Sequence, residues 1–273
     1  MNKVTLITNI FNEEYLLPFW LKYHKNVFDH GIVIDWCSTD RSLQIIKQIC
    51  PTWEIRSTKH IYQGKPLFET ITADEEIMEI ESTISGYKIF LNVTEWLLTT
   101  RNIRDLLDFN TVDKCYPIHV LSPIKTLPNY TPTSTKEFIA CFRNKLTSVY
   151  HKRKFRFIFN RSNGNYIPGR HLTNDPNDTK HVDLINYNPV MNGLMIVWCG
   201  YFPLTEQMFQ RKLSVSKHMC KKTELDRGFC YQHFWEKNEM NKDYNELCYS
   251  NKPILNNAFI NLCIDHAILI TDK

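Results

Sequence analysis

The chain has 273 residues, of which 43 % are apolar and 23 % charged, and 33 basic against 29 acidic side chains give a net charge of +4. These ordinary globular values exclude a disordered chain, a collagen-like repeat and a small disulfide scaffold. Only 8 residues are glycine, and no two of them can form the G-x-G-x-x-G loop of a Rossmann dinucleotide site. A nucleotide bound by this chain would therefore be held without a glycine-rich loop.

The cysteines and the N-terminus predict a reducing compartment. None of the nine cysteines forms a C-x-x-C pair, so zinc-ribbon spacing is absent, and most of them are expected to be buried free thiols. The first eight residues resemble the start of a strand rather than a signal peptide. No window contains eighteen uninterrupted apolar residues, so no transmembrane helix is expected. These features favour a cytoplasmic protein, for which peripheral membrane contact stays an option.

Within the first hundred residues, short apolar runs alternate with segments of helical spacing. This β-α-β-α-β-α-β order predicts an open parallel sheet with right-handed crossovers. The third helix is expected to begin with a capping box formed by Thr72 and Glu75, and the acidic residues within 74–79 are expected to face solvent. The expected strands are 4–8, 31–35, 53–57 and 87–93, and the first two expected helices are 14–28 and 41–50.

Beyond residue 100 the pattern is less regular. The absence of an internal repeat or a linker favours one continuous domain over residues 1–273. The basic run 151–154 is interpreted as a solvated strand entry rather than a polyanion contact. The expected strands are 116–121, 155–159, 182–187 and 191–198, the expected helices are 136–149 and 205–218, and a further apolar stretch covers 254–270.

Polar residues collect where three of the early strands end. The first strand ends at Thr8-Asn9 and leads into Asn12-Glu13, the second ends at Asp35, and the fourth leads into 92–95. In an open parallel sheet, ligands bind beyond the carboxyl ends of the strands. A carboxylate there can accept from a uracil-like base or from ribose hydroxyls, and a second one can hold a divalent ion on a diphosphate. Local roles, such as helix caps or Asx turns, stay open for each residue alone.

Two strings at these strand ends resemble the family-2-like glycosyltransferases. The first is N-E-E-x-x-L-P-x-W-L-x-Y-H from Asn12 to His24, and the second is D-x-x-S-T-D-x-S from Asp35 to Ser42. The resemblance covers residues 4–96. It implies a GT-A-type α/β fold, with an open, mostly parallel sheet flanked by helices and a C-terminal acceptor-side α+β extension. It also implies transfer, usually inverting, from a UDP- or GDP-linked sugar to a glycan or another hydroxyl acceptor.

The resemblance also assigns residues to a nucleotide site. Residues 1–100 would form the nucleotide-binding half and 101–273 the acceptor half. The nucleotide would be contacted by Thr8, Asn9, Asn12, Glu13, Asp35, Ser38 and Asp40.

The place of the family's metal-binding Asp-x-Asp string differs in this chain. It contains Asn92-Val93-Thr94, followed by Glu95 and an aromatic residue. Two alternatives follow. Manganese or magnesium could be held by Glu95 with Asn92 or a later histidine, or the site could be metal-free, with Lys or Arg offsetting the phosphate charge.

An inverting transferase needs a base for the acceptor hydroxyl and a stabiliser for the leaving diphosphate. The candidates for the base are Glu95, His171 and Asp226, without an order among them. Arg170 and His171 lie in a predicted loop from which they could reach the diphosphate.

Two alternatives come from other classes of protein. The missing aspartates at 92 and 94 are compatible with an inactive relative that binds a sugar or a partner protein. A nucleic-acid binder would use 151–156 together with Phe155, Phe157 and Phe159, but the small net charge argues against it. No nucleic-acid partner is therefore expected.

Overall fold

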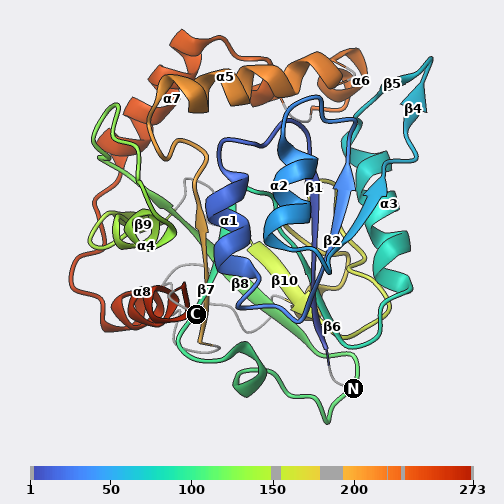
Figure 1. The fold of residues 1–273 in the computed structure, drawn as a ribbon, viewed down its shortest axis with the longest axis horizontal. Coiled ribbons are helices and arrows are strands. Elements are labelled where there is room, and N and C mark those ends of the chain that lie inside the picture. The colour runs from blue at the N-terminus through green and yellow to red at the C-terminus, as the bar shows by residue number, and fades with distance from the viewer. Residues whose placement is uncertain (1–2, 149–154, 179–192, 220, 229–230, 272–273) are drawn as a thin grey trace.

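The computed structural model describes residues 3–148, 155–178, 193–219, 221–228 and 231–271. Its main sheet has the strand order β3-β2-β1-β6-β10-β8-β11-β7, with β9 alongside β8 (Figure 1). A second, two-stranded sheet pairs β4 with β5. The strands are β1 (Val4–Ile10), β2 (His30–Asp35), β3 (Glu54–Ser57), β4 (Ile61–Tyr62), β5 (Lys65–Pro66), β6 (Tyr87–Phe90), β7 (Glu95–Thr99), β8 (Cys115–Pro123), β9 (Leu146–Ser148), β10 (Phe155–Phe159) and β11 (Leu194–Trp198).

The N-terminal half of the sheet is parallel. β1 pairs with β2 on one side and with β6 on the other, and β2 pairs with β3. The chain therefore runs outward from β1 to β3 and then returns to the opposite side of β1. This reversal of strand order places a topological switch point between β1 and β6, where α/β proteins bind ligands at the carboxyl ends of the strands.

The C-terminal half adds mixed pairing to this parallel block. β10 is antiparallel to both β6 and β8, β11 is parallel to β8, and β7 closes the order antiparallel to β11. The predicted fold class, an α/β open sheet flanked by helices with an α+β extension, is confirmed.

Helices cover both faces of the sheet. Alternation along β10 shows the division, because Phe155, Phe157 and Phe159 join the core beside α3, whereas Ile158 joins the core beside α1, α2, α4 and α8. Helices α5 and α6 cross the end of the sheet at which β1 and β2 finish (Figure 1). The helices are α1 (Leu17–His24), α2 (Ser42–Ile49), α3 (Thr70–Ser82), α4 (Thr135–Ala140), α5 (Glu206–Val215), α6 (Lys221–Asp226), α7 (Lys237–Ser250) and α8 (Ala258–Thr271).

Two predictions about helices are wrong. Helix α3 begins at Thr70, after a Glu69 whose side chain forms no cap, so the capping box at Thr72 and Glu75 is absent. The helix expected over 136–149 ends at Ala140, and residues 146–148 form β9 instead. The strand expected over 182–187 and the basic run 151–154 lie outside the described residues.

Burial also corrects two expectations. Asp74 and Glu76 on α3 are only 3 % and 4 % exposed, whereas Glu75 and Glu79 are exposed, so two of the four acidic residues within 74–79 face solvent as expected and two do not. Of the seven cysteines described, Cys50, Cys199 and Cys263 are buried, so burial is not the rule among them. Among the described residues, no helix is both long and apolar enough to cross a membrane.

Candidate functional site

The loops after β1 and β2 are tied together by Asn12. This residue has a φ of 52°, a left-handed conformation that asparagine tolerates better than most residues. Its side-chain oxygen accepts from the backbone N–H groups of Thr39 (2.8 Å) and Asp40 (3.3 Å), and its own N–H donates to Ser38 Oγ at 3.1 Å. One asparagine thus joins two neighbouring strand ends.

The two aspartates that follow β2 shape the same loop. Asp35, buried at the last position of β2, accepts from the Ser38 N–H, three residues on, at 3.0 Å through Oδ1. Asp40 accepts from Glu14 N–H through Oδ2 (3.0 Å) and from Ser42 N–H through Oδ1 (2.9 Å). Of the local roles that stayed open from the sequence, the side-chain caps of α1 and α2 are not formed, and the Asx turn forms at Asp40 rather than at Asp35. The hydrogen bonds of Asp35 and Asp40 place both carboxylates at the carboxyl edge of the sheet.

Glu13 connects this edge to helix α5. Its carboxylate forms a bidentate ion pair with the Arg211 guanidinium, and both side chains are nearly buried. Burial raises the pKa of Glu13, and the nearby Arg211 charge opposes that rise. A second contact between this edge and α5 is the hydrogen bond of 2.6 Å between the Tyr15 and Thr205 hydroxyls, at the start of the helix.

Glu95 occupies the first position of β7 and pairs with Arg156 of β10. Arg156 Nη2 donates to Oε1 at 2.7 Å and Nε donates to Oε2 at 2.9 Å. The two side chains are 1 % and 4 % exposed. Oε2 also accepts from the backbone N–H (2.9 Å) and the side-chain amide (3.3 Å) of Asn92. Both carboxylate oxygens are therefore engaged inside the protein.

Arg156 also holds the loop that contains His171. Its Nη1 donates to the Arg170 carbonyl oxygen at 2.9 Å and lies 2.7 Å from His171 Nδ1. Because a guanidinium has no acceptor atom, His171 Nδ1 must accept, which leaves the proton of the neutral imidazole on Nε2. Asp74 of α3 secures the same loop by pairing with Arg170 and accepting from the Gly169 N–H at 2.8 Å.

The structure brings most of the sequence-predicted residues to the carboxyl edge. Thr8 is buried and Asn9 half-buried within β1, where Asn9 pairs with Ile34 of β2. Asp226 lies apart as the exposed last residue of α6, and no described hydrogen bond or ion pair joins it to Glu95 or His171. The two clusters are Asn12, Glu13, Asp35, Ser38 and Asp40 around the β1 and β2 ends, and Asn92, Glu95 and His171 around Arg156.

Sequence reasoning missed the roles of Arg156, Arg211 and Asp74. A signal existed for Arg156, because a lone charge within the apolar run 155–159 must find a partner if the strand is buried on both faces. The same burial removes the stacking surface of the suggested nucleic-acid site, since Phe155, Phe157 and Phe159 all lie in the core.

The donors around Glu95 do not fit a divalent cation. Within the part of the chain that the structure describes, no group of three His, Cys, Asp or Glu side chains could hold a metal ion. Glu95 is paired with Arg156, and the Asn92 and Thr94 side chains are neutral where the sequence resemblance implies aspartates. Hard divalent cations prefer several charged oxygen ligands.

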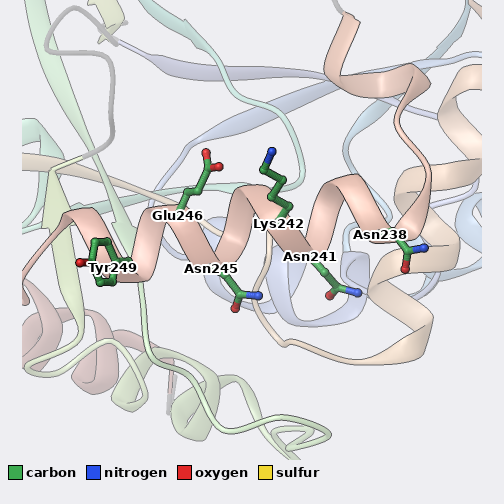
Figure 2. Close-up of a pocket in the computed structure, with 6 residues that line it drawn as sticks. All are labelled: Asn238, Asn241, Lys242, Asn245, Glu246 and Tyr249. Atoms are coloured by element: carbon green, nitrogen blue, oxygen red, sulfur yellow. The ribbon is translucent and has the colours of Figure 1, made fainter.

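A hollow on the outer side of α7 is separate from this edge. It is lined by residues of that one helix (Figure 2), namely Asn238, Asn241, Lys242, Asn245, Glu246 and Tyr249. Because the lining side chains come from a single element, they do not converge on a bound molecule from several sides, as they do in most ligand sites.

No family model matches the sequence, and no curated protein sequence matches it either. Among solved structures, partial matches are found at low TM-scores. TarS of S. aureus is 18 % identical with a TM-score of 0.30, over 50 % of this chain and 39 % of that one.

Two further structures contain a nucleotide sugar and manganese. Glucosyl-3-phosphoglycerate synthase of Mycobacterium tuberculosis, with UDP-glucose and phosphoglyceric acid, is 16 % identical at a TM-score of 0.33, over 58 % of this chain and 57 % of that one. A mannosyltransferase of Pyrobaculum calidifontis, with GDP-mannose, is 15 % identical at a TM-score of 0.28, over 46 % and 36 %. This chain therefore spans less than two thirds of the length of each of the three proteins.

Proposed function

We propose that this protein is a glycosyltransferase that moves a sugar from a UDP- or GDP-linked donor to a hydroxyl of a glycan or another acceptor, with inversion. The observation that carries the proposal is the meeting of the two family-like strings in one hydrogen-bonded cluster. Asn12 of the first string binds Ser38, Thr39 and Asp40 of the second. This cluster lies at the carboxyl ends of β1 and β2, beside the switch point where such sheets bind nucleotides.

In this proposal the N-terminal half, 1–100, binds the nucleotide and 101–273 binds the acceptor. Asp35 uses Oδ1 for the Ser38 N–H, and we assign its Oδ2 to a base imide or a ribose hydroxyl. Thr8, Asn9 and Asn12 form the floor of the same site.

The base of the proposed reaction is assigned by elimination among the three candidates. Glu95 is bound on both oxygens by Arg156, and His171 accepts from Arg156 through Nδ1, so its Nε2 donates rather than accepts. Asp226 has an exposed carboxylate at the end of α6. Because α6 crosses the carboxyl end of the sheet (Figure 1), Asp226 is assigned the acceptor proton, and His171 Nε2–H is assigned a hydrogen bond to the leaving diphosphate.

Thermal unfolding with a panel of UDP- and GDP-sugars, each with and without manganese, tests the proposal. A donor at one hundred times its Kd stabilises by about 2.7 kcal/mol, which raises Tm by roughly 5–10 °C. Asp35→Ala should remove the shift. Asp105→Ala, which changes an exposed aspartate in the turn after β7, should retain it. The absence of a shift with every nucleotide sugar would overturn the proposal.

The second candidate is an inactive relative that binds a sugar or a partner protein. It is favoured by the neutral residues at 92 and 94 and by the internal pairing of Glu95. Transfer or hydrolysis of a donor, lost in Asp226→Asn while the Tm shift persists, would exclude this candidate. Donor binding without turnover would support it.

A further inference from the structure

Arg156 joins Glu95, which the sequence offered as a metal ligand, to His171, which it offered as a candidate base. We propose that the Arg156 guanidinium is the resident cation of this site, so that the nucleotide diphosphate binds without a divalent metal ion. This inference rests on the proposed function for its ligand, although its claim about Arg156 can be tested on the protein alone.

The contacts of Arg156 are those that a bridging cation would make. Nη2 and Nε of the guanidinium donate to the two carboxylate oxygens of Glu95, at 2.7 and 2.9 Å, and Nη1 donates to Nδ1 of His171 at 2.7 Å. A metal ion would have to use the same carboxylate oxygens and the same imidazole lone pair. Because arginine stays protonated in proteins, this occupant is present at every working pH.

Burial keeps the Arg156 guanidinium in its place beside Glu95. Arg156 comes from the middle of the sheet, and its side chain is 4 % exposed against 1 % for Glu95. Nη1 is also held by the Arg170 carbonyl oxygen at 2.9 Å. A dissolved cation that took Glu95 would leave the buried Arg156 guanidinium without its partner, so such a cation competes poorly for the position.

The local charge balance agrees with this assignment. An Asp-x-Asp string followed by Glu would place three carboxylates together, and a divalent ion would offset part of that charge. Here Asn92 and Thr94 are neutral, and the one carboxylate, Glu95, is already matched by Arg156. The neighbouring Asp74 is matched by Arg170 in the same way.

The first experiment measures manganese and nucleotide binding to the full chain. Mn²⁺ is titrated into the wild type and into Glu95→Gln, and electron paramagnetic resonance measures the bound metal. The two proteins are expected to bind Mn²⁺ equally, because no site depends on Glu95. Calorimetry then measures the Kd of UDP and of GDP, each once in excess EDTA and once in Mn²⁺. For each nucleotide, the two Kd values should agree within about threefold, which is less than the tenfold change that about 1.4 kcal/mol of binding free energy would cause. A Glu95-dependent Mn²⁺ site, or nucleotide binding that needs Mn²⁺, would overturn the inference.

The second experiment asks whether removing the guanidinium creates a metal site. Arg156→Met should acquire Mn²⁺ binding that is lost again in the Arg156→Met, Glu95→Gln double variant. Arg161→Met, which breaks the partly buried pair with Asp178, is the matched control and should acquire none. If Arg156→Met does not fold, the wild-type titration still decides the question. The absence of UDP and GDP binding in both buffers would contradict the proposed function, whereas the Mn²⁺ titration alone would decide the role of Arg156.

Discussion

At the scale of single residues, loss of the buried arginine of β10, Arg156, should strongly reduce the free energy of unfolding. Arg156→Met leaves the Glu95 carboxylate buried without its partner, and breaking such a pair costs about 3–5 kcal/mol. Arg143→Met is the control, because Arg143 and its partner Asp265 are 38 % and 61 % exposed and such a surface pair contributes at most about 1 kcal/mol. Urea unfolding of the three proteins measures the difference. Equal losses for the two variants would contradict the buried pairing.

Glu81 makes stability depend on pH. It lies in the core, where it accepts from Tyr166 Oη (2.7 Å) and the Gly164 N–H (2.8 Å), and burial raises its pKa from 4.5 to about 7. The folded state therefore holds a proton that the unfolded state has released between about pH 4.5 and 7. The stabilisation from protonated Glu81 is complete below about pH 4.5 and is lost as the pH rises through 7.

Glu81→Gln removes this titration from the folded protein. The variant should gain stability relative to the wild type as the pH rises from 5 to 8, by up to about 3 kcal/mol for a shift of this size. Urea unfolding at four pH values gives the difference curve. Glu79→Gln, on the exposed side of the same helix, should show no such gain, and parallel curves for Glu81→Gln and the wild type would contradict the prediction.

At the scale of elements, local patterns predicted the helices and strands that depend on local residues. Strands β1, β2 and β6 were found because each belongs to a short apolar run that ends at a polar turn. The start of α3 was missed because its cap is a distant carboxylate, as Glu224 of α6 accepts from the Thr70 N–H (2.7 Å) and hydroxyl (2.6 Å). The helix over 136–149 was overextended because Asn144, at a φ of 56°, turns the chain before β9.

The candidate site also has a part that local sequence patterns predict and a part that depends on distant residues. The residues at strand ends were predicted because strand ends are visible in an apolar pattern. Their partners were not, since Arg156 lies 61 residues from Glu95 and Arg211 lies 198 residues from Glu13. Such pairs follow from strand order, and β10 enters the sheet beside β6 only through long connections.

A testable prediction at the scale of elements concerns how α5 is attached to the loop after β1. The shared hydrogen bond between Tyr15 and Thr205 joins the first loop to the start of α5, where Thr205 also accepts from the Met208 N–H. In a double-mutant cycle, Tyr15→Phe and Thr205→Val should couple by about 0.5–1.5 kcal/mol. Tyr15→Phe with Ser134→Ala, which removes only the cap of α4, should be additive. Zero coupling in the first cycle would show that this bond does not hold α5 in solution.

At the scale of the whole molecule, the carboxyl edge is assembled from segments far apart in the sequence. The loops after β1 and β2 supply Asn12 and Asp35, the loop after β10 supplies His171, and α5 supplies Arg211. Each segment is attached to another by a hydrogen bond or an ion pair. A ligand at this edge should therefore stabilise all of them together, whereas a ligand on α7 would stabilise that helix alone.

Hydrogen exchange with and without a saturating nucleotide sugar distinguishes these cases. Bound donor should slow exchange at 12–14, 38–42, 169–171 and 206–215, because opening any of these segments then requires release of the ligand. Exchange along α7, beside the hollow of Figure 2, should stay unchanged. Asp35→Ala should abolish the protection in all four segments at once, since each depends on the same bound molecule. Protection confined to α7, or to one of the four segments, would place the ligand elsewhere than at the switch point.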